Sequence, residues 1–362
     1  MKQQSTYVSK YLIVDSTVSK LYAHLIQSYL NNSLIDFSTH QPLYELLTNM
    51  KVRGCPDYSE QVSFPEMESL VKGVSRALGS LSFGIDIGRH IHPSDFGIVG
   101  YALMNCNTLH QALGVAAEHK HMMNEGFQIQ LTTRGEYCRF IIKDLINSPY
   151  INPLVEMDFA VAFQIAKFLV GSQKQHMVKI IQVNFQHKPS ESLEFYQEYF
   201  NCPVKFGQET NELILSRKML DIPVRSADPR LLKVYMRKVV RMQRQRNTNQ
   251  ATHQRVFIYI SSHLDRQIPN MNDVANHFNM SLSTLKKRLQ IEGYNYTKIC
   301  DLVRKNQAIK LVASQTMQLK EIGLVLGFAN PSAFNRAFKR WTDITPADYR
   351  RSTLVEEVES DV

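Results

Sequence analysis

The segment GFANPSAFNRAFKRWTDITPADYRR (327–351) decides the fold of the C-terminal part of the chain. Asn330 is a good helix cap, and Pro331 suits the first helical position because its missing N–H costs nothing there. Three aromatic residues then recur at helical spacing and predict one buried face: Phe334, Phe338 and Trp341. The other side chains of this helix are mostly polar or cationic. The segment therefore predicts a capped amphipathic helix whose exposed face has a purpose of its own.

A weaker copy of this pattern lies 48 residues upstream. NDVANHFNMSLSTLKKRLQ (272–290, the first reader) and KEIGLVLGFANPSAFNRAFKRW (320–341, the second reader) both predict a short helix, a tight turn and a capped second helix. Each short helix carries a tiny residue that lets two helices cross closely, and each turn carries a residue that tolerates positive φ. The tiny, turn and cap residues are Ala275, Asn279 and Ser281 in the first reader and Gly323, Gly327 and Asn330 in the second. Each copy predicts a helix-turn-helix.

The second helix of each reader presents polar and basic side chains opposite a buried pair, Leu285 with Leu289 or Phe334 with Phe338. Arginine and lysine can bond guanine edges in a major groove, serine and asparagine can bond other base edges, and cations suit phosphates. The candidate DNA contacts on these faces are Ser283, Thr284, Lys286 and Lys287 in the first reader and Ser332, Asn335, Arg336, Lys339 and Arg340 in the second, with Lys339 and Arg340 directed at phosphates.

TKICDLVRKNQAIKLVAS (297–314) predicts a helix that joins the two readers. At 1.5 Å per residue it is about 27 Å long, which suits two reading helices about one DNA turn apart. One protomer would then contact two successive segments of the major groove of double-stranded DNA.

The distribution of charge favours a polyanionic partner. Residues 225–351 hold 23 lysines and arginines against 8 acidic residues (+15), and residues 1–224 hold 19 against 21 (−2). The tail 352–362 holds four acidic residues and no basic one (−4), which brings the chain to +9. Because phosphate neutralisation drives nucleic-acid affinity, this asymmetry favours DNA over a merely solvated basic surface.

Length and composition indicate a soluble protein with two globular domains, since 362 residues exceed one ordinary core and 44% of them are hydrophobic. The most apolar stretch, DFAVAFQIAKFLVG (158–171), is interrupted by Gln164 and Lys167, and the start MKQQSTYVSK lacks the apolar core of a signal peptide. We therefore expect a cytoplasmic protein with no membrane partner. Scattered cysteines without paired spacing indicate reduced thiols at Cys55, Cys106, Cys138, Cys202 and Cys300.

The N-terminal part mixes helix and strand signals and predicts an α+β domain. Helical periodicity covers 17–34, 64–80, 108–126 and 153–170, and alternation predicts a hairpin at 127–144 and a strand at 179–186. A basic amphipathic helix follows at 228–246. The predicted domains are an α+β effector or dimerisation domain (1–246), a linker (247–252), an all-α domain of two helix-turn-helix motifs joined by a linker helix (253–351) and an acidic tail (352–362).

These motifs carry a family resemblance. GFANPSAFNRAFKRWTDITPADYR resembles the signature of the AraC/XylS family of transcription regulators, and HFNMSLSTLKKRLQIEG resembles that family's first helix-turn-helix. Upstream, IDIGRHIHPSDFGIVGYALMNCNTLHQAL, VNFQHKPSESLEFYQEYF and CPVKFGQETNELILSRKMLDIPVRSADPRLL resemble the arabinose-binding-type N-terminal domain of one branch of the family. The resemblance implies an N-terminal domain that senses a small molecule or mediates dimerisation. By position, it implies base contacts at Ser283, Lys286 and Lys287 and at Ser332, Ala333 and Arg336.

Two residues depart from the family pattern. Asp343 stands where the family usually has glycine before ITP, and Asn279 stands where glycine is common in the first turn. Both residue types tolerate positive φ better than most, so we expect the fold to be retained. The acid at Asp343 could weaken a contact with a phosphate.

The sequence gives no sign of catalysis or of a cofactor. Two histidine pairs, His90 with His92 and His119 with His121, have i,i+2 spacing, which does not share a helix face, and no cysteine or acid stands at ligand spacing beside them. Structural histidines are therefore favoured over a metal site. Phosphate loops, nucleophile elbows and paired-carboxylate motifs are not found, and GIDIGRH (84–90) lacks the glycine pattern of a dinucleotide site.

Apolar residues of the N-terminal domain could line an effector pocket, although the same pattern is common in plain core. The candidates are Tyr101, Met104, Met122, Met123, Phe127 and Phe140.

The leading interpretation is a transcription activator that binds promoter DNA as a homodimer, works with RNA polymerase and is controlled by a small-molecule effector or by dimerisation. One alternative is a protein-interaction adaptor whose basic helices bind an acidic partner. Another is an enzyme with a fused DNA-binding domain, which the missing catalytic motifs disfavour.

Overall fold

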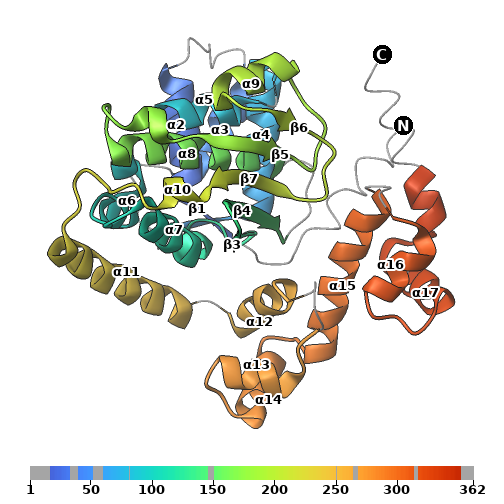
Figure 1. Cartoon of the computed structure of the whole chain (residues 1–362). Helices are drawn as coiled ribbons and strands as arrows, with labels where there is room; N and C mark the ends of the chain where they lie inside the picture. Colours follow the sequence, from blue (N-terminus) through green and yellow to red (C-terminus); the bar gives the residue numbers. More distant parts are fainter. Residues whose placement is uncertain are drawn as a thin grey trace. The chain divides into compact units, whose positions relative to one another are not determined.

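The computed structural model describes residues 17–32, 40–51, 60–80, 82–145, 151–249, 251–263, 268–313 and 317–351 (Figure 1). The chain divides into two compact units. One, the α+β unit, is formed by residues 14–144 and 148–249, and the other, the helical unit, is formed mainly by residues 250–362. The predicted order, an α+β domain followed by an all-α domain, is confirmed.

A five-stranded sheet forms the centre of the α+β unit, in the order β3-β4-β7-β5-β6. Its neighbours pair antiparallel except β5 and β6, which are parallel. A separate pair, β1 with β2, is antiparallel. The strands are β1 (Thr17–Ser19), β2 (Gln61–Ser63), β3 (Phe127–Arg134), β4 (Tyr137–Asp144), β5 (Ile180–Asn184), β6 (Val204–Lys205) and β7 (Asn211–Ser216).

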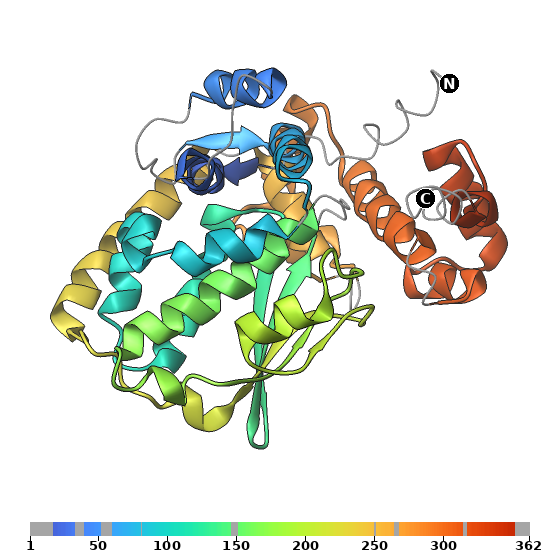
Figure 2. The same ribbon diagram turned by 90° about the horizontal axis from the view of Figure 1, so that it is seen from above.

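Helices make up most of the rest of the α+β unit. They are α2 (Lys20–Asn32), α3 (Gln41–Asn49), α4 (Phe64–Leu78), α5 (Phe83–His90), α6 (Gly97–Met104), α7 (Leu109–Met123), α8 (Asn152–Val170), α9 (Leu193–Phe200), α10 (Arg217–Leu220) and α11 (Pro229–Asn249), with short 3-10 helices η2 (Pro93–Phe96) and η4 (Gln175–Met177). In both views α8 lies against the sheet and α11 lies along α6 (Figures 1 and 2).

The predicted hairpin is confirmed as β3 and β4, which pair from Phe127 opposite Asp144 to Arg134 opposite Tyr137. Gly135 makes the turn with φ 59°, a conformation that glycine adopts freely. The predicted long helix is confirmed as α8. The aromatic core centres on Phe185 after β5, whose ring centre lies 5.5 Å from that of Phe159 on α8 and 5.2 Å from that of Phe206.

Two sequence predictions need correction. The helix predicted from residue 17 begins at Lys20, because Thr17–Ser19 pair with Gln61–Ser63 as strand β1. Helical periodicity did not reveal this, since a partner strand about 45 residues away decides it. In addition, β2, β6 and β7 were not predicted. β7 (NELILS) pairs on both sides, and periodicity alone cannot assign its short continuous apolar run, LIL, to a strand.

The predicted linker, 247–252, lies partly within helices. Helix α11 continues through Asn249, and α12 begins at Thr252. A polar composition without bulky apolar residues does not by itself end a helix, because polar residues propagate helices well enough. The predicted domain ends, 246 and 253, stay a prediction, and the acidic tail 352–362 lies outside the described residues.

The helical unit contains α12 (Thr252–Ser261), α13 (Met271–His277), α14 (Leu282–Ile291), α15 (Tyr296–Ala313), α16 (Leu319–Val325) and α17 (Pro331–Thr342). Helices α13 and α14 form the first reader, and α16 and α17 form the second. The long helix α15 joins the two pairs, as predicted (Figure 1). No helix within the described ranges is both long enough and apolar enough to span a membrane.

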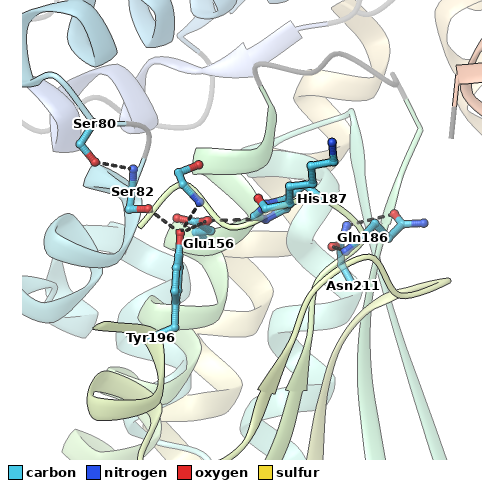
Figure 3. Close-up of polar contacts among 9 residues, drawn as sticks. Ser80, Ser82, Glu156, Gln186, His187, Tyr196 and Asn211 are labelled. Atoms are coloured by element: carbon cyan, nitrogen blue, oxygen red, sulfur yellow. Dashed lines mark hydrogen bonds and ion pairs between the residues drawn. The ribbon is translucent and has the colours of Figure 1, made fainter. Parts of the chain in front are cut away.

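A buried polar cluster connects three helices of the α+β unit (Figure 3). Tyr196 of α9 donates a hydrogen bond to Glu156 Oε1 of α8 at 3.0 Å and shares another, at 2.6 Å, with Ser82, the residue directly before α5. His187 Nε2 lies 3.6 Å from Glu156 Oε1. Burial raises the pKa of Glu156 to about 8, although hydrogen bonds from Tyr196 and Ser82 lower it, and burial lowers the pKa of His187. Glu156 therefore carries a proton in the native protein at neutral pH.

The sign of this pKa shift predicts how stability depends on pH. In the unfolded chain Glu156 releases its proton near its ordinary value of 4.5, whereas the native carboxyl retains it up to about pH 8. The contribution of Glu156 to the free energy of unfolding is thus present below about pH 4.5 and is lost as pH rises to about 8, by an amount on the order of several kcal/mol. Because glutamine does not ionise, we expect Glu156→Gln to keep its free energy of unfolding over this pH range and to be more stable than the wild type at pH 8.

The measurement is chemical unfolding between pH 6.5 and 9, followed by far-UV circular dichroism. Burial keeps the native His187 ring neutral in this range, and the titration of His187 in the unfolded chain is common to wild type and variant, so the difference between the two proteins isolates Glu156. The single tryptophan, Trp341, lies in the helical unit, and its fluorescence transition serves as the control. Parallel pH curves for the two proteins would contradict the prediction.

Candidate nucleic-acid interface and effector cavity

The reading helix of the second reader, α17, begins where the sequence places it. Asn330 is the N-cap, and its side-chain oxygen accepts a hydrogen bond from the Ala333 N–H at 2.8 Å. Pro331 occupies the first helical position. Gly327 forms the preceding turn with φ 76°. The cap therefore fixes the first turn of the helix, which is the part that enters a groove in helix-turn-helix proteins.

The inward face of α17 is held by close packing against α16 and α15. Phe334 and Phe338 are fully buried in a cluster with Ala308, Val312, Ile322 and Leu326. A Cβ atom added at Gly323 of α16 would lie 2.9 Å from the Cβ of Phe334, which is closer than real Cβ contacts. The predicted role of Gly323 is confirmed, because the two helices cross at a distance that leaves no space for a side chain.

The outward face of α17 is exposed and contains no acidic residue. Ser332, Asn335, Arg336 and Lys339 are exposed, and Ala333 is half-buried. Arg340 forms an ion pair with Asp301 of α15, with 3.5 Å between Nη2 and Oδ2, while 68% of its side chain remains exposed. Exposed pairs of this kind contribute at most about 1 kcal/mol, so phosphate could compete for the guanidinium. Asp343, with φ 66°, ends the helix without glycine.

The first reader repeats this arrangement with different polar groups. Ser281 caps α14 by accepting from the Thr284 N–H at 3.1 Å, and its hydroxyl also lies 2.9 Å from that of Ser283 and 2.8 Å from that of Thr284. Lys286 and Lys287 are exposed on the same helix. The structure thus gathers the four predicted contacts on one helix, with the two hydroxyls already bonded to the cap.

Helix α15 sets the distance between the readers. It has 18 residues and a length of about 27 Å at 1.5 Å per residue. Arg350 caps its C-terminal end by donating to the carbonyl oxygens of Val312 at 3.0 Å and Leu311 at 3.5 Å, and it also donates to that of Met317, beyond the helix, at 2.9 Å. Arg350 therefore contributes to the basicity of this half of the chain and to the structure of the unit.

Sequence reasoning missed a clamp at the start of the helical unit. Ala251, the N-cap of α12, makes no side-chain cap, and Glu292 takes its place by accepting from the backbone N–H groups of Thr252 at 2.8 Å and His253 at 2.7 Å. Burial alone would raise the pKa of Glu292, but the hydrogen bonds from Thr252 and His253 outweigh this effect and the net shift lowers the pKa. The carboxylate is therefore held ionised. The His253 ring also stacks on Tyr294, with 4.1 Å between ring centres. Local sequence carries no signal for a cap that lies 40 residues away.

A cavity of about 90 Å³ lies inside the α+β unit, bounded by α6, α7, α8, β3 and β4. Of the six predicted pocket residues, Met123 and Phe140 line it. Met122 and Phe127 are buried but lie outside its wall, and Met104 is half-buried. Tyr101 is exposed, with its ring centre 5.8 Å from that of Tyr235 on α11.

The cavity wall contains a buried ion pair that sequence reasoning missed. Lys120 Nζ of α7 lies 2.6 Å from Asp158 Oδ2 of α8. Tyr22 of α2 donates to Asp158 Oδ1 at 2.7 Å and also accepts a hydrogen bond from Lys120. Burial lowers the pKa of Lys120, whereas Asp158 raises it. The available signal was an acid within the apolar run of α8, since a buried charge needs a partner.

Comparisons with known proteins agree with this geometry. Residues 54–224 match the model of the arabinose-binding domain of AraC transcription regulators, and residues 274–352 match a helix-turn-helix domain model. The ornithine utilization regulator of Pseudomonas aeruginosa is 25% identical over 295 residues, which cover 81% of this chain and 85% of that protein. The transcriptional regulator VqsM of the same organism is 24% identical over 325 residues, covering 86% and 96%.

A solved structure is also similar to this chain. The crystal structure of the transcriptional regulator CdpR from Pseudomonas aeruginosa matches with 22% identity and a TM-score of 0.42, covering 88% of this chain and 99% of that chain. The matching family models and the named relatives are those of transcription regulators rather than enzymes.

The close crossing of α16 and α17 predicts a strong effect of one added methyl group. Gly323→Ala should reduce the stability of the second reader by about 1 to 3 kcal/mol, because the backbone must shift to admit the Cβ. Trp341 packs beside Phe328, with 5.9 Å between ring centres, so its fluorescence reports the unfolding of this reader directly.

Gly114→Ala is the matched control. A Cβ at this position in α7 would meet nothing within 4 Å, so the same substitution should stabilise its helix by up to about 1 kcal/mol. If Gly323→Ala were as stable as the wild type in the unfolding transition followed by Trp341 fluorescence, the crossing of α16 and α17 would not be tight.

Proposed function

We propose, from the premise that the chain belongs to the AraC/XylS family of transcription regulators, that it activates promoters as a homodimer under the control of a small-molecule effector. The chain is a transcription regulator with a helix-turn-helix DNA-binding domain. Dimerisation, activation through RNA polymerase and effector control go beyond that description and form the proposal.

One observation carries the proposal for DNA: two capped reading helices expose matched polar faces at the two ends of a single 18-residue helix. The first reader offers Lys286 and Lys287, and the second offers Arg336 and Lys339. A span of about 27 Å is close to one turn of B-DNA, about 34 Å. We infer that Arg336 reads a base and that Lys339 contacts a phosphate.

Effector control is supported by the cavity of the α+β unit. A cavity whose wall is mostly apolar and contains a few convergent polar groups is the usual form of a small-molecule site. A ligand there would contact α6, α7 and α8 at once. If it binds one arrangement of the protein more tightly than another, it shifts the balance between them.

The adaptor alternative makes a different prediction for the same surface. An acidic protein partner would need the basic residues of α14 and α17 but would not distinguish one DNA sequence from another. Preference for promoter sites over random DNA therefore separates the two functions. The sites themselves would come from chromatin immunoprecipitation in the native host.

Substitution of two of the three cations of α17, Arg336 and Lys339, should have unlike effects. Arg336→Ala should cost about 1 to 3 kcal/mol on the promoter site and relax the preference at one base pair. Lys339→Ala should weaken binding to all sequences alike and reduce the slope of log K against log[salt] by about 0.9. Fluorescence anisotropy on promoter and random duplexes at several salt concentrations measures both.

Lys179→Ala, an exposed cation in the α+β unit, is the control for a general loss of charge. Equal losses for Arg336→Ala on promoter and random DNA would refute its assignment as a base contact.

Filling the cavity should separate effector control from DNA binding. Ala162 lines the cavity, and Ala162→Leu should occupy part of it while leaving the affinity for promoter DNA within about twofold of wild type. The target promoter should then lose its response to growth conditions in a reporter assay. Ala117→Leu, on α7 but outside the cavity wall, should keep the response. A normal response from Ala162→Leu would exclude this cavity as the effector site.

A further inference from the structure

The lining of the cavity restricts the chemistry of its occupant. Sixteen of its eighteen lining residues are apolar, and the two exceptions are Lys120 and Asp158. Among the described lining residues, no side chain carries a hydroxyl or amide group, and no other side chain is charged. A ligand can therefore form strong hydrogen bonds at one place only.

That one polar place carries no net charge. Lys120 and Asp158 are both nearly buried, with 5% and 9% of their side chains exposed, and they bond each other at 2.6 Å. Tyr22 bonds to both partners and completes the cluster. An extra carboxylate or ammonium group in the cavity would remain uncompensated, since each charge of the pair is already neutralised. Burial of an unpaired charge is strongly unfavourable, so charged ligands are disfavoured.

The pair still offers one donor. An ammonium group has three N–H bonds, and within the described part of the chain two of them are used by Asp158 and Tyr22. The aromatic neighbour Phe127, whose ring centre lies 5.5 Å from Lys120 Nζ, is a weaker acceptor than an oxygen atom. A carbonyl or ether oxygen of a ligand could accept the third hydrogen bond.

We propose that this cavity takes a neutral, predominantly apolar small molecule that carries one hydrogen-bond acceptor oxygen, held by Lys120. The inference rests on the proposed role of the cavity as the effector site and names the class of effector. A sugar fits poorly despite the description of the matching domain model, because most of its hydroxyl groups would face apolar side chains without partners. The cavity volume of about 90 Å³ limits the ligand to a small one, although Met123 and Met219 in the wall can adapt their shape.

A matched set of probes tests the class directly. Cyclopentanone, cyclopentane, cyclopentanecarboxylate and cyclopentylamine share one ring and differ in charge and in acceptor, and L-arabinose represents the sugars. The full-length protein labelled at its methionine methyl groups reports binding by NMR, because Met123 and Met219 line the cavity whereas Met122 is buried outside its wall. We expect cyclopentanone to shift the signals of Met123 and Met219 but not that of Met122.

The expected order of affinity among the probes follows from the buried ion pair of Lys120 and Asp158. Cyclopentanone should bind about tenfold or more tightly than cyclopentane, as a hydrogen bond to a charged donor implies. The carboxylate, the amine and L-arabinose should bind more weakly than either. Tighter binding of any of these three than of cyclopentanone would overturn the proposal, and so would the absence of shifts at Met123 and Met219 with every probe.

A triple variant tests the role of Lys120. Tyr22→Phe, Lys120→Met and Asp158→Leu together replace the whole polar cluster with apolar groups of similar size, which buried ion pairs commonly tolerate. In this variant the preference for cyclopentanone over cyclopentane should disappear, and persistence of the preference would contradict the assignment. If the variant does not fold, the probe series on wild type still decides the class. If the probes exclude this class of ligand, the effect of Ala162→Leu on the promoter response still tests whether the cavity is the effector site.

Discussion

The second reader depends on a helix crossing so close that only glycine fits at the contact. This residue is Gly323, where a Cβ would lie 2.9 Å from that of Phe334. The corresponding residue of the first reader, Ala275, is also buried, at 2% exposed. Because Phe334 and Phe338 are seated by this contact, the opposite side of α17 can only face outward. The direction in which Arg336 and Lys339 point is thus a result of packing on the other side of their helix.

The sequence allowed prediction of features whose causes are local. The caps at Ser281 and Asn330, the positive φ at Asn279 and Asp343, and the hairpin around Gly135 all follow from residue types within a few positions. Strands β1 and β7 were missed because they exist through partners far along the chain. The DNA-contacting residues were chosen by outward direction on a helix, which periodicity predicts well. Their contacts with bases stay a prediction.

The cavity was harder to predict because α7 and α8 are apolar on more than one side. Met122 and Met123 are adjacent and equally apolar, yet only Met123 reaches the cavity wall, and periodicity cannot choose between two buried faces. Two acids of α8 have different environments for the same reason. Glu156 turns towards Tyr196 and Ser82 and keeps its proton at neutral pH, whereas Asp158 turns towards Lys120 at the cavity. On this one helix, therefore, the buried carboxyl group of Glu156 is kept neutral by a proton, whereas that of Asp158 is balanced by an ion pair.

The clamp made by Glu292 has a consequence for the order of events during synthesis. Helix α12 leaves the ribosome first, but the carboxylate that caps its N-terminus follows 40 residues later. Until then the backbone N–H groups of Thr252 and His253 have no cap within the helical unit, and the helix end is unfavourable. The α+β unit, whose chain is already complete by Asn249, has time to fold before that point. A nascent chain therefore completes its α+β unit before the first helix of its helix-turn-helix unit is capped.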